Sequence, residues 1–248
     1  MSDRICRRAV CVVLVLSLVT SGVAVLAGEA DEGRLPEPRW NSPSEGEIAE
    51  AIDGLAFDAF VETSYRLYLM RFPQTLTALG LAEVFGVRND RLNDYSEAYV
   101  RETERIESMI LERLRGQDRD ALSDEQRLTY DVCTWYWDDR VRGHAYVDFD
   151  HPVTHFFITS LDLLLYDTMT ETHPIRSVDE AWDYVIRLHQ VADQFAQVLD
   201  TIDRRRAQGI IVPRVMIDWA LPDIQAMAYA SAERHPSVSY THLRAHET

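Results

Sequence analysis

Lysine is missing from this chain, and its absence narrows the possible partners. All 25 basic residues are arginine, against 41 acidic residues, so the formal net charge is −16. Binding to a nucleic-acid backbone depends on a basic surface that displaces counterions, and no basic stripe interrupts the acidity of this sequence. We therefore expect no nucleic-acid partner.

Cysteine is scarce as well. The chain has three cysteines, and Cys6 and Cys11 fall in the N-terminal apolar segment, which leaves Cys133 alone. No intrachain disulfide is expected once that segment is removed. Because Cys133 lies among apolar residues of a predicted helix, we interpret it as a small packing residue.

The familiar catalytic motifs and the patterns of a sheet are also lacking. The sequence contains no GxSxG, no Gly-rich phosphate loop and no CxxC, and no HExxH before its C-terminal tail. No stretch alternates as a strand does, and no repeat of 20–50 residues occurs. Hydrophobic residues make up 46% of the chain, which is enough for a packed core. These features predict an all-α fold, a multi-helix bundle or array, with no catalytic residue identified.

The N-terminal segment has the layout of an export signal. Three arginines precede an apolar run from Ala9 to Leu26, and Val25–Ala27 has the small-residue pattern of a cleavage site. We interpret residues 1–27 as a signal peptide and expect an exported, periplasmic or extracellular protein with no membrane contact after cleavage. An uncleaved anchor is the alternative, because the apolar run is nearly long enough to span a bilayer.

The other end of the chain resembles a laboratory sequence. Residues Val238–Thr248 read VSYTHLRAHET, which corresponds to one reading frame of a transposase-type sequencing adapter. We interpret residues 237–248 as adapter translation. The HxxxH formed by His242 and His246 is therefore not taken as a metal site. We also expect that the natural C-terminal part of the gene is missing.

Between these ends, residues 28–47 read as a Pro-rich linker and residues 48–236 as a helical domain. Caps, apolar periodicity and breakers predict seven helices. Their expected positions are 48–72, 74–81, 97–114, 124–142, 156–169, a long helix capped by Ser177 and ended by Gly209, and 214–230 with a kink or a break at Pro222. The helix at 124–142 is apolar around most of its circumference, so we expect it to be central.

The long helix has the clearest pattern. Its apolar residues recur at three- and four-residue steps and predict one buried stripe, made of Trp182, Val185, Leu188, Ala192, Phe195, Leu199 and Ile202. Asp183 and Arg187 are four residues apart, acid first, and are expected to pair on the solvent side. His189 borders the stripe and is interpreted as a boundary residue rather than a ligand.

Two groups could hold or perform chemistry. His151 and His155 lie four residues apart with Asp148 and Asp150 nearby, which makes them candidate zinc ligands; the alternative is a polar loop before a helix that starts near Pro152. Asp138 and Asp139 follow an aromatic run, but neighbours on a helix point about 100° apart, so we do not expect them to converge.

Several phrases together resemble a known family. They are RFPQTLTALGL at Arg71–Leu81, RLNDYS at Arg91–Ser96, ALSDEQRLTYDV at Ala121–Val132, and AWDYVIRL and GIIVPRVMI further on. In this order they resemble the N-terminal half of the bacterial family called domain of unknown function 885.

That family is similar to helical zinc metallopeptidases of the gluzincin type. The resemblance implies a peptide substrate, a zinc cofactor and an HExxPGH-like zinc motif downstream of this chain, so no site residue is carried over. We therefore expect the N-terminal region of an exported, zinc-dependent, metallopeptidase-like hydrolase whose catalytic half is absent. The alternative is a non-catalytic helical binding domain of the cell envelope.

Overall fold

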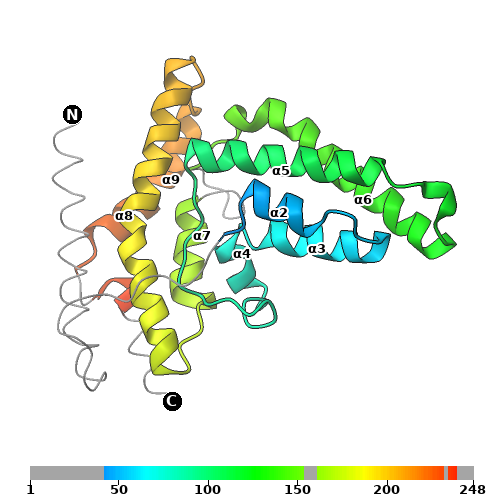
Figure 1. The fold of residues 1–248 in the computed structure, drawn as a ribbon. Helices are drawn as coiled ribbons and strands as arrows, with labels where there is room; N and C mark the ends of the chain where they lie inside the picture. The colour runs from blue at the N-terminus through cyan, green and yellow to red at the C-terminus, as the bar shows by residue number, and fades with distance from the viewer. Residues whose placement is uncertain (1–41, 154–160, 232–233, 239–248) are drawn as a thin grey trace. The chain divides into compact units, whose positions relative to one another are not determined.

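The computed structural model describes residues 42–153, 161–231 and 234–238, and these form two compact units. We call Asn41–Phe72 with Asp94–Asp150 the α5–α6 unit. The α8 unit consists of Pro73–Asn93 and the described residues from His151 onward. The described residues contain helices and no strand, so the chain is an all-α helical array as predicted (Figure 1).

The α5–α6 unit is built from four α-helices and two short 3₁₀ helices. They are α2 (Glu45–Ala51), α3 (Phe57–Leu69), α5 (Glu97–Arg115), η1 (Arg119–Ala121), α6 (Asp124–Gly143) and η2 (His144–Phe149). The long helices α5 and α6 lie side by side (Figure 1). The predicted capping box forms at the start of α6. Ser123 Oγ accepts a hydrogen bond from the Gln126 main-chain amide, and Gln126 Oε1 accepts one from the Ser123 main-chain amide.

The core of this unit forms where α2, α3, α5 and α6 meet. Its fully buried apolar side chains include Ile48, Phe60, Ile106, Leu114 and Trp137. The rings of Tyr68 and Trp137 meet edge to face, with centroids 4.9 Å apart. Such apolar contacts are the main stabilising term for helices of this length.

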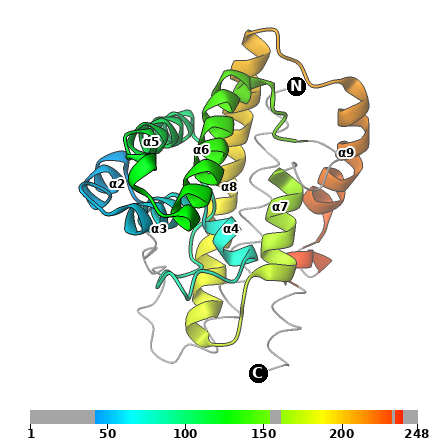
Figure 2. The same cartoon turned by 90° about the vertical axis from the view of Figure 1, so that its right-hand side faces the viewer.

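The α8 unit contains one very long helix and several shorter ones. It has α4 (Pro73–Ala78), α7 (Leu161–Asp167), the π-helical turn η3 (Thr168–Thr172), α8 (Val178–Ala207) and α9 (Arg214–Tyr229). Ser177 caps α8 by accepting from the Glu180 amide, and Gly209 follows its end at φ +80°, as predicted. Figure 2 shows the chain passing from the end of α8 into α9.

The buried face of α8 differs from the predicted stripe. Val185 is buried, but Leu199 is 50% exposed. Four polar side chains are buried on this helix instead, namely Asp183, Arg187, Gln194 and Arg205. The expectation that Asp183 and Arg187 pair on the solvent side was therefore wrong: both are buried, and the ion-pair partner of Asp183 is Arg88.

Three further expectations need correction. The predicted helix at 48–72 is two helices, because the chain turns at Gly54, whose φ of +64° lies in the left-handed region. The segment after Gly143 was expected to be loop or extended but forms η2. Helix α6 is not central: Trp137 is its one fully buried residue.

The predicted helix at 156–169 is described only from Leu161, where α7 begins. The predicted signal peptide lies outside the described residues, as does most of the predicted tail. Within the described residues, no helix has both the length and the apolar character needed to cross a bilayer.

Candidate functional site

The structure describes one of the two histidines that the sequence suggests as zinc ligands. His151 is half-buried just after η2, and His155 lies outside the described residues. Asp148 lies 3.7 Å from a guanidinium nitrogen of Arg101, so it already has a cationic neighbour. A protein zinc site needs at least three side-chain ligands. The described residues contain no group of three His, Cys, Asp or Glu side chains that could hold a metal, and the zinc site at His151 and His155 stays a prediction because His155 is not among them.

Asp138 and Asp139 do not form a carboxylate pair. Asp138 lies 2.6 Å from Arg115 Nη2 and 3.3 Å from Arg142 Nε. Asp139 lies 3.0 Å from Arg142 Nη2. Both carboxylates therefore belong to a chain of partly exposed ion pairs on α5 and α6.

Cys133 and His189 show no activation for chemistry. Cys133 is half-buried beside the core of the α5–α6 unit, and burial raises the pKa of its thiol. A raised pKa disfavours the thiolate, which is the reactive form. Burial lowers the pKa of His189, and its buried Nε2 has no hydrogen-bond partner among the described residues.

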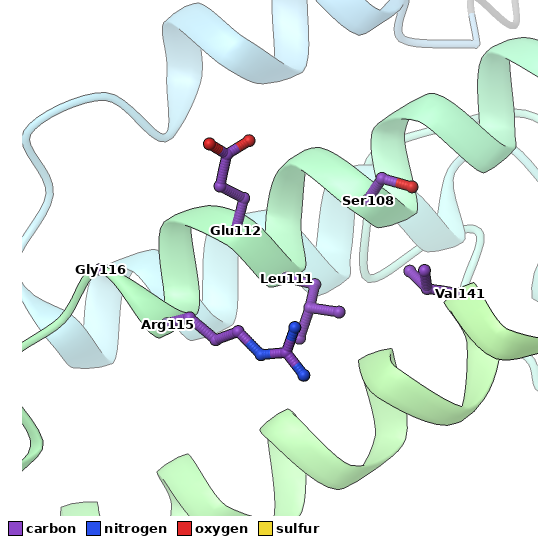
Figure 3. Close-up of a pocket in the computed structure, with 6 residues that line it drawn as sticks. All are labelled: Ser108, Leu111, Glu112, Arg115, Gly116 and Val141. Carbon is purple, nitrogen blue, oxygen red and sulfur yellow. The ribbon is translucent and has the colours of Figure 1, made fainter.

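A cavity of about 440 Å³ opens between α5 and α6. Figure 3 shows its lining residues, which are Ser108, Leu111, Glu112, Arg115, Gly116 and Val141. Leu111 is buried and gives the cavity an apolar wall, while the Ser108 hydroxyl donates to the Glu104 carbonyl. No nucleophile stands next to a base among these lining residues.

Next to this cavity lies a buried carboxylate. Glu107 is 2% exposed, and its Oε1 accepts from Tyr68 Oη at 2.7 Å and from Arg140 Nε at 2.9 Å and Nη2 at 2.6 Å. Its Oε2 lies 2.5 Å from His144 Nε2. Burial and then the Glu107 charge raise the pKa of Tyr68, so the phenol stays protonated and donates. Glu107 thus joins α3, α5 and the end of α6.

A buried arginine, Arg71, forms several hydrogen bonds near the start of the α5–α6 unit. Arg71 donates to the Pro43 carbonyl at 2.6 Å and to Thr103 Oγ1 at 3.1 Å, and it pairs with Glu102 at 3.0 Å. Its guanidinium carbon lies 3.8 Å from the ring centroid of Tyr99. This stacked and forked geometry is specific to arginine and is unavailable to lysine.

The largest polar cluster lies in the α8 unit around Arg187, which is fully buried. Its Nη1 lies 2.9 Å from His173 Nδ1, its Nη2 donates to Thr77 Oγ1 at 2.6 Å, and its Nε donates to the Arg91 carbonyl at 2.9 Å. Burial lowers the pKa of Arg187 to about 9, which leaves it protonated at neutral pH. Its hydrogen-bond partners among the described residues are neutral acceptors.

Amide side chains continue this cluster about two turns further along α8, at Gln194. The Gln74 and Asn93 side chains each accept from the other residue's main-chain amide, at 2.9 Å and 3.1 Å. Gln194 Nε2 donates to Gln74 Oε1 and to the Asn93 carbonyl, both at 2.8 Å. The reciprocal bonds therefore join the two ends of the segment 73–93, and Gln194 ties both ends to α8.

Three of the phrases that suggested a family meet in this cluster. Gln74 and Thr77 come from the first phrase, Asn93 from RLNDYS, and Arg187 from AWDYVIRL. Sequence reasoning missed these residues because polar side chains on an amphipathic helix are normally assigned to solvent. The available signal was the i, i+3/i+4 spacing of Arg187, Gln190 and Gln194, which marks a second, polar stripe on α8.

A family model confirms the resemblance. The family described as "Bacterial protein of unknown function (DUF885)" matches residues 73–247. The chain belongs to this family. The DUF885 match begins at Pro73, where α4 and the α8 unit begin, and it extends over the tail that we interpret as adapter-derived, an interpretation that stays a prediction. No curated protein and no solved structure matched the chain.

Proposed function

We propose that this chain is the N-terminal helical part of an exported, zinc-dependent metallopeptidase-like hydrolase that acts on peptides. Membership of the DUF885 family supports the proposal, together with the resemblance of that family to gluzincin-type enzymes. The zinc ligands and the catalytic glutamate are expected on a segment that this chain does not contain. Bound zinc would polarise the peptide carbonyl and acidify a water molecule.

The observation that carries the proposal is the surface of α9. Val215 and Trp219 are 50% and 58% exposed, and Ile217 and Leu221 are 46% and 44% exposed. At 100° per residue these two pairs lie on opposite sides of the helix. A helix that is apolar on opposite sides is typical of the interior of a larger protein, so the surface of α9 supports a further segment packed around it.

Helix α6 of the α5–α6 unit gives the same indication. Leu128, Val132 and Trp135 follow each other at four- and three-residue steps and are 66%, 56% and 67% exposed. They form one apolar stripe on the side of α6 away from its buried Trp137. Contiguous exposed apolar surface of this kind marks a contact with another part of a protein or with a partner.

The alternative, a non-catalytic binding domain, is favoured by the cavity between α5 and α6. It has an apolar wall formed by Leu111 and charged residues at its rim, and it lacks a catalytic pair. A binding domain would need no further segment for activity. The two functions therefore differ in what the intact gene encodes.

The deciding experiment starts from the genomic locus. Sequencing past the codon for Ala230 is expected to reveal a longer reading frame with an HExxH-type motif on a predicted helix. The intact protein is then expected to hydrolyse peptides, to lose activity with a chelator, and to lose it when the motif glutamate becomes glutamine. A natural stop codon soon after position 236, or an intact protein without the motif, would leave the binding domain as the function.

The chain itself offers a second measurement. Because α6 and α9 expose apolar surface, the purified chain is expected to self-associate in analytical ultracentrifugation. Replacing Trp135 and Trp219 by glutamine should shift it toward monomer, whereas the same change at the core residue Trp137 should unfold the α5–α6 unit instead. A wild-type chain that stays monomeric at all concentrations would remove the support drawn from α6 and α9.

A further inference from the structure

His173 and Arg187 form a sealed pair in the α8 unit. Neither side chain has measurable exposure. Arg187 Nη1 lies 2.9 Å from His173 Nδ1, and His173 Nε2 lies 3.2 Å from the Glu180 carbonyl oxygen. An arginine only donates and a carbonyl only accepts. The imidazole is therefore neutral, with its proton on Nε2 and its lone pair on Nδ1 facing the guanidinium.

This pair controls how the segment 73–93 is held. Besides His173, the Arg187 guanidinium bonds Thr77 Oγ1 on α4 and the Arg91 carbonyl. One turn further along α8, Gln190 accepts from the Leu92 amide and donates to the Asp90 carbonyl. A shift of Arg187 would therefore break contacts at both ends of the segment.

Protonation of His173 is incompatible with this arrangement. An imidazolium has two N–H donors and no acceptor, so the N–H of Arg187 would face another N–H at 2.9 Å. Two cations would then lie next to each other away from water, which is among the least favourable arrangements in a protein interior. We propose that His173 and Arg187 form an acid-sensitive latch that holds residues 73–93 on α8 at neutral pH and releases them as the pH falls.

The direction of the pH effect follows from linkage. Burial and then the neighbouring guanidinium hold the pKa of His173 well below its ordinary value of 6.5. A group with a depressed pKa in the closed state supports closure above its pKa in the open state and loses that support as the pH falls. Below pH 6.5 the open population should therefore rise about tenfold per pH unit.

Other charged groups around the pair respond differently in the same pH range. Burial raises the pKa of Asp183, although Arg88 opposes this. Through Asp183, acidification therefore favours the closed state and works against release of residues 73–93. Asp90 acts on Arg187 through its charge, and Tyr184 meets the His173 ring edge to face. Glu171, two residues before His173 in the chain, is exposed. The pKa of Glu180 is lowered from 4.5, so the stability that Glu180 contributes to the closed state is lost only below that pH.

The test is hydrogen exchange with mass spectrometry on the full chain between pH 5 and 7.5, corrected for intrinsic rates. Amides of residues 73–93 are expected to lose protection about tenfold per pH unit below 6.5, while α5 amides keep theirs. His173→Gln keeps an acceptor for Arg187 and a donor for Glu180 but cannot be protonated, so its residues 73–93 should respond little to pH. His189→Gln on α8 is the matched control and should behave as wild type; His235→Gln checks the other described histidine with a pKa lowered by burial.

Three outcomes would overturn the latch. Residues 73–93 could show no selective loss of protection, His173→Gln could keep the wild-type pH response, or a control variant could remove it. If His173→Gln fails to fold, nitrogen NMR of the wild-type chain at pH 7.5 decides, because the latch requires the Nε2–H tautomer of His173. Finding the proton on Nδ1 would exclude the proposed geometry.

Discussion

Each unit buries several charged side chains, and two of them, Glu107 and Arg187, are accommodated in opposite ways. Glu107 in the α5–α6 unit is an anion, and Arg140 and His144 bring positive or protonatable partners to it. Those partners are open to water, with side-chain exposures of 45% and 22%. In the α8 unit the buried group is a cation, Arg187, and its partners are a neutral imidazole, a hydroxyl and main-chain carbonyls.

This difference teaches what each unit tolerates. If Glu107 is lost, its charged or protonatable partners Arg140 and His144 can turn to solvent and be hydrated, and only the buried Tyr68 hydroxyl is left without its acceptor. If Arg187 is lost, the acceptors around it remain sealed without a donor, and a buried unsatisfied group costs about 1–3 kcal/mol. The α8 unit should therefore be the more sensitive of the two to a single substitution, although it contains fewer charges in contact.

The largest effect is expected from Arg187→Met, which keeps an unbranched side chain, shorter than that of arginine, and removes its donors. Thr77 Oγ1, the Arg91 carbonyl and His173 Nδ1 would all lose their partner, and we expect a loss of about 4 kcal/mol in the opening free energy of α8 amides. Hydrogen exchange measures this unit by unit. Arg206→Met, at an exposed position of the same helix, should change it by less than about 0.5 kcal/mol. Similar values for both variants would contradict the sealed description.

Glu107→Gln is expected to cost less, about 2–3 kcal/mol, read from α5 amides. The change removes the charge that Arg140 and His144 face, but both partners can reach water, so the cost stays below the 3–5 kcal/mol typical of a broken buried pair. The exposed Glu112 on the same helix provides the control substitution. A larger effect for Glu107→Gln than for Arg187→Met would reverse the comparison between the units.

Tyr68→Phe isolates one bond of the Glu107 cluster. The ring still packs against Trp137, but the hydrogen bond of 2.7 Å to a charged acceptor is lost, which we expect to cost about 1.5 kcal/mol. Tyr184→Phe in the α8 unit removes a hydroxyl that donates to the neutral carbonyls of Met169 and Ser237 and should cost about 1 kcal/mol. Equal losses would mean that the charge on Glu107 adds nothing to its bond with Tyr68.

The smallest effect is expected at the surface of the α5–α6 unit. Asp138→Asn weakens ion pairs with Arg115 and Arg142, whose side chains are 54% and 64% exposed. Pairs of this kind contribute about 0.5 kcal/mol or less and weaken with salt. Urea unfolding at low and high ionic strength should show the difference shrinking with salt, whereas the effect of Glu107→Gln should persist.

Local rules predicted the local structure well. Ser123, Ser177 and Gly209 each act at a helix end as expected, because a cap depends on residues only a few positions away. The break at Gly54 was missed because an isolated glycine is tolerated in a helical pattern, and only the structure shows that its φ is positive.

The polar clusters could not be found by the same rules. The spacing of Asp183 and Arg187 fits a solvent-side pair. Nothing in the local pattern reveals that Asp183 instead pairs with Arg88 and that Arg187 lies against His173. Those partners lie 95 and 14 residues away along the chain, so only the tertiary fold decides which face of α8 is buried. The family phrases covered residues of this cluster, and the polar spacing of Arg187, Gln190 and Gln194 was the other sequence signal for it.

The Arg187 guanidinium donates a hydrogen bond to the main-chain carbonyl oxygen of residue 91. A carbonyl oxygen is the same atom in every amino acid, so the identity of residue 91 is not constrained by this bond. Evolution can therefore vary that side chain, and an engineer can randomise it, provided that the backbone keeps its course. Within the DUF885 family, substitutions at position 91 should accordingly be better tolerated than any replacement of Arg187.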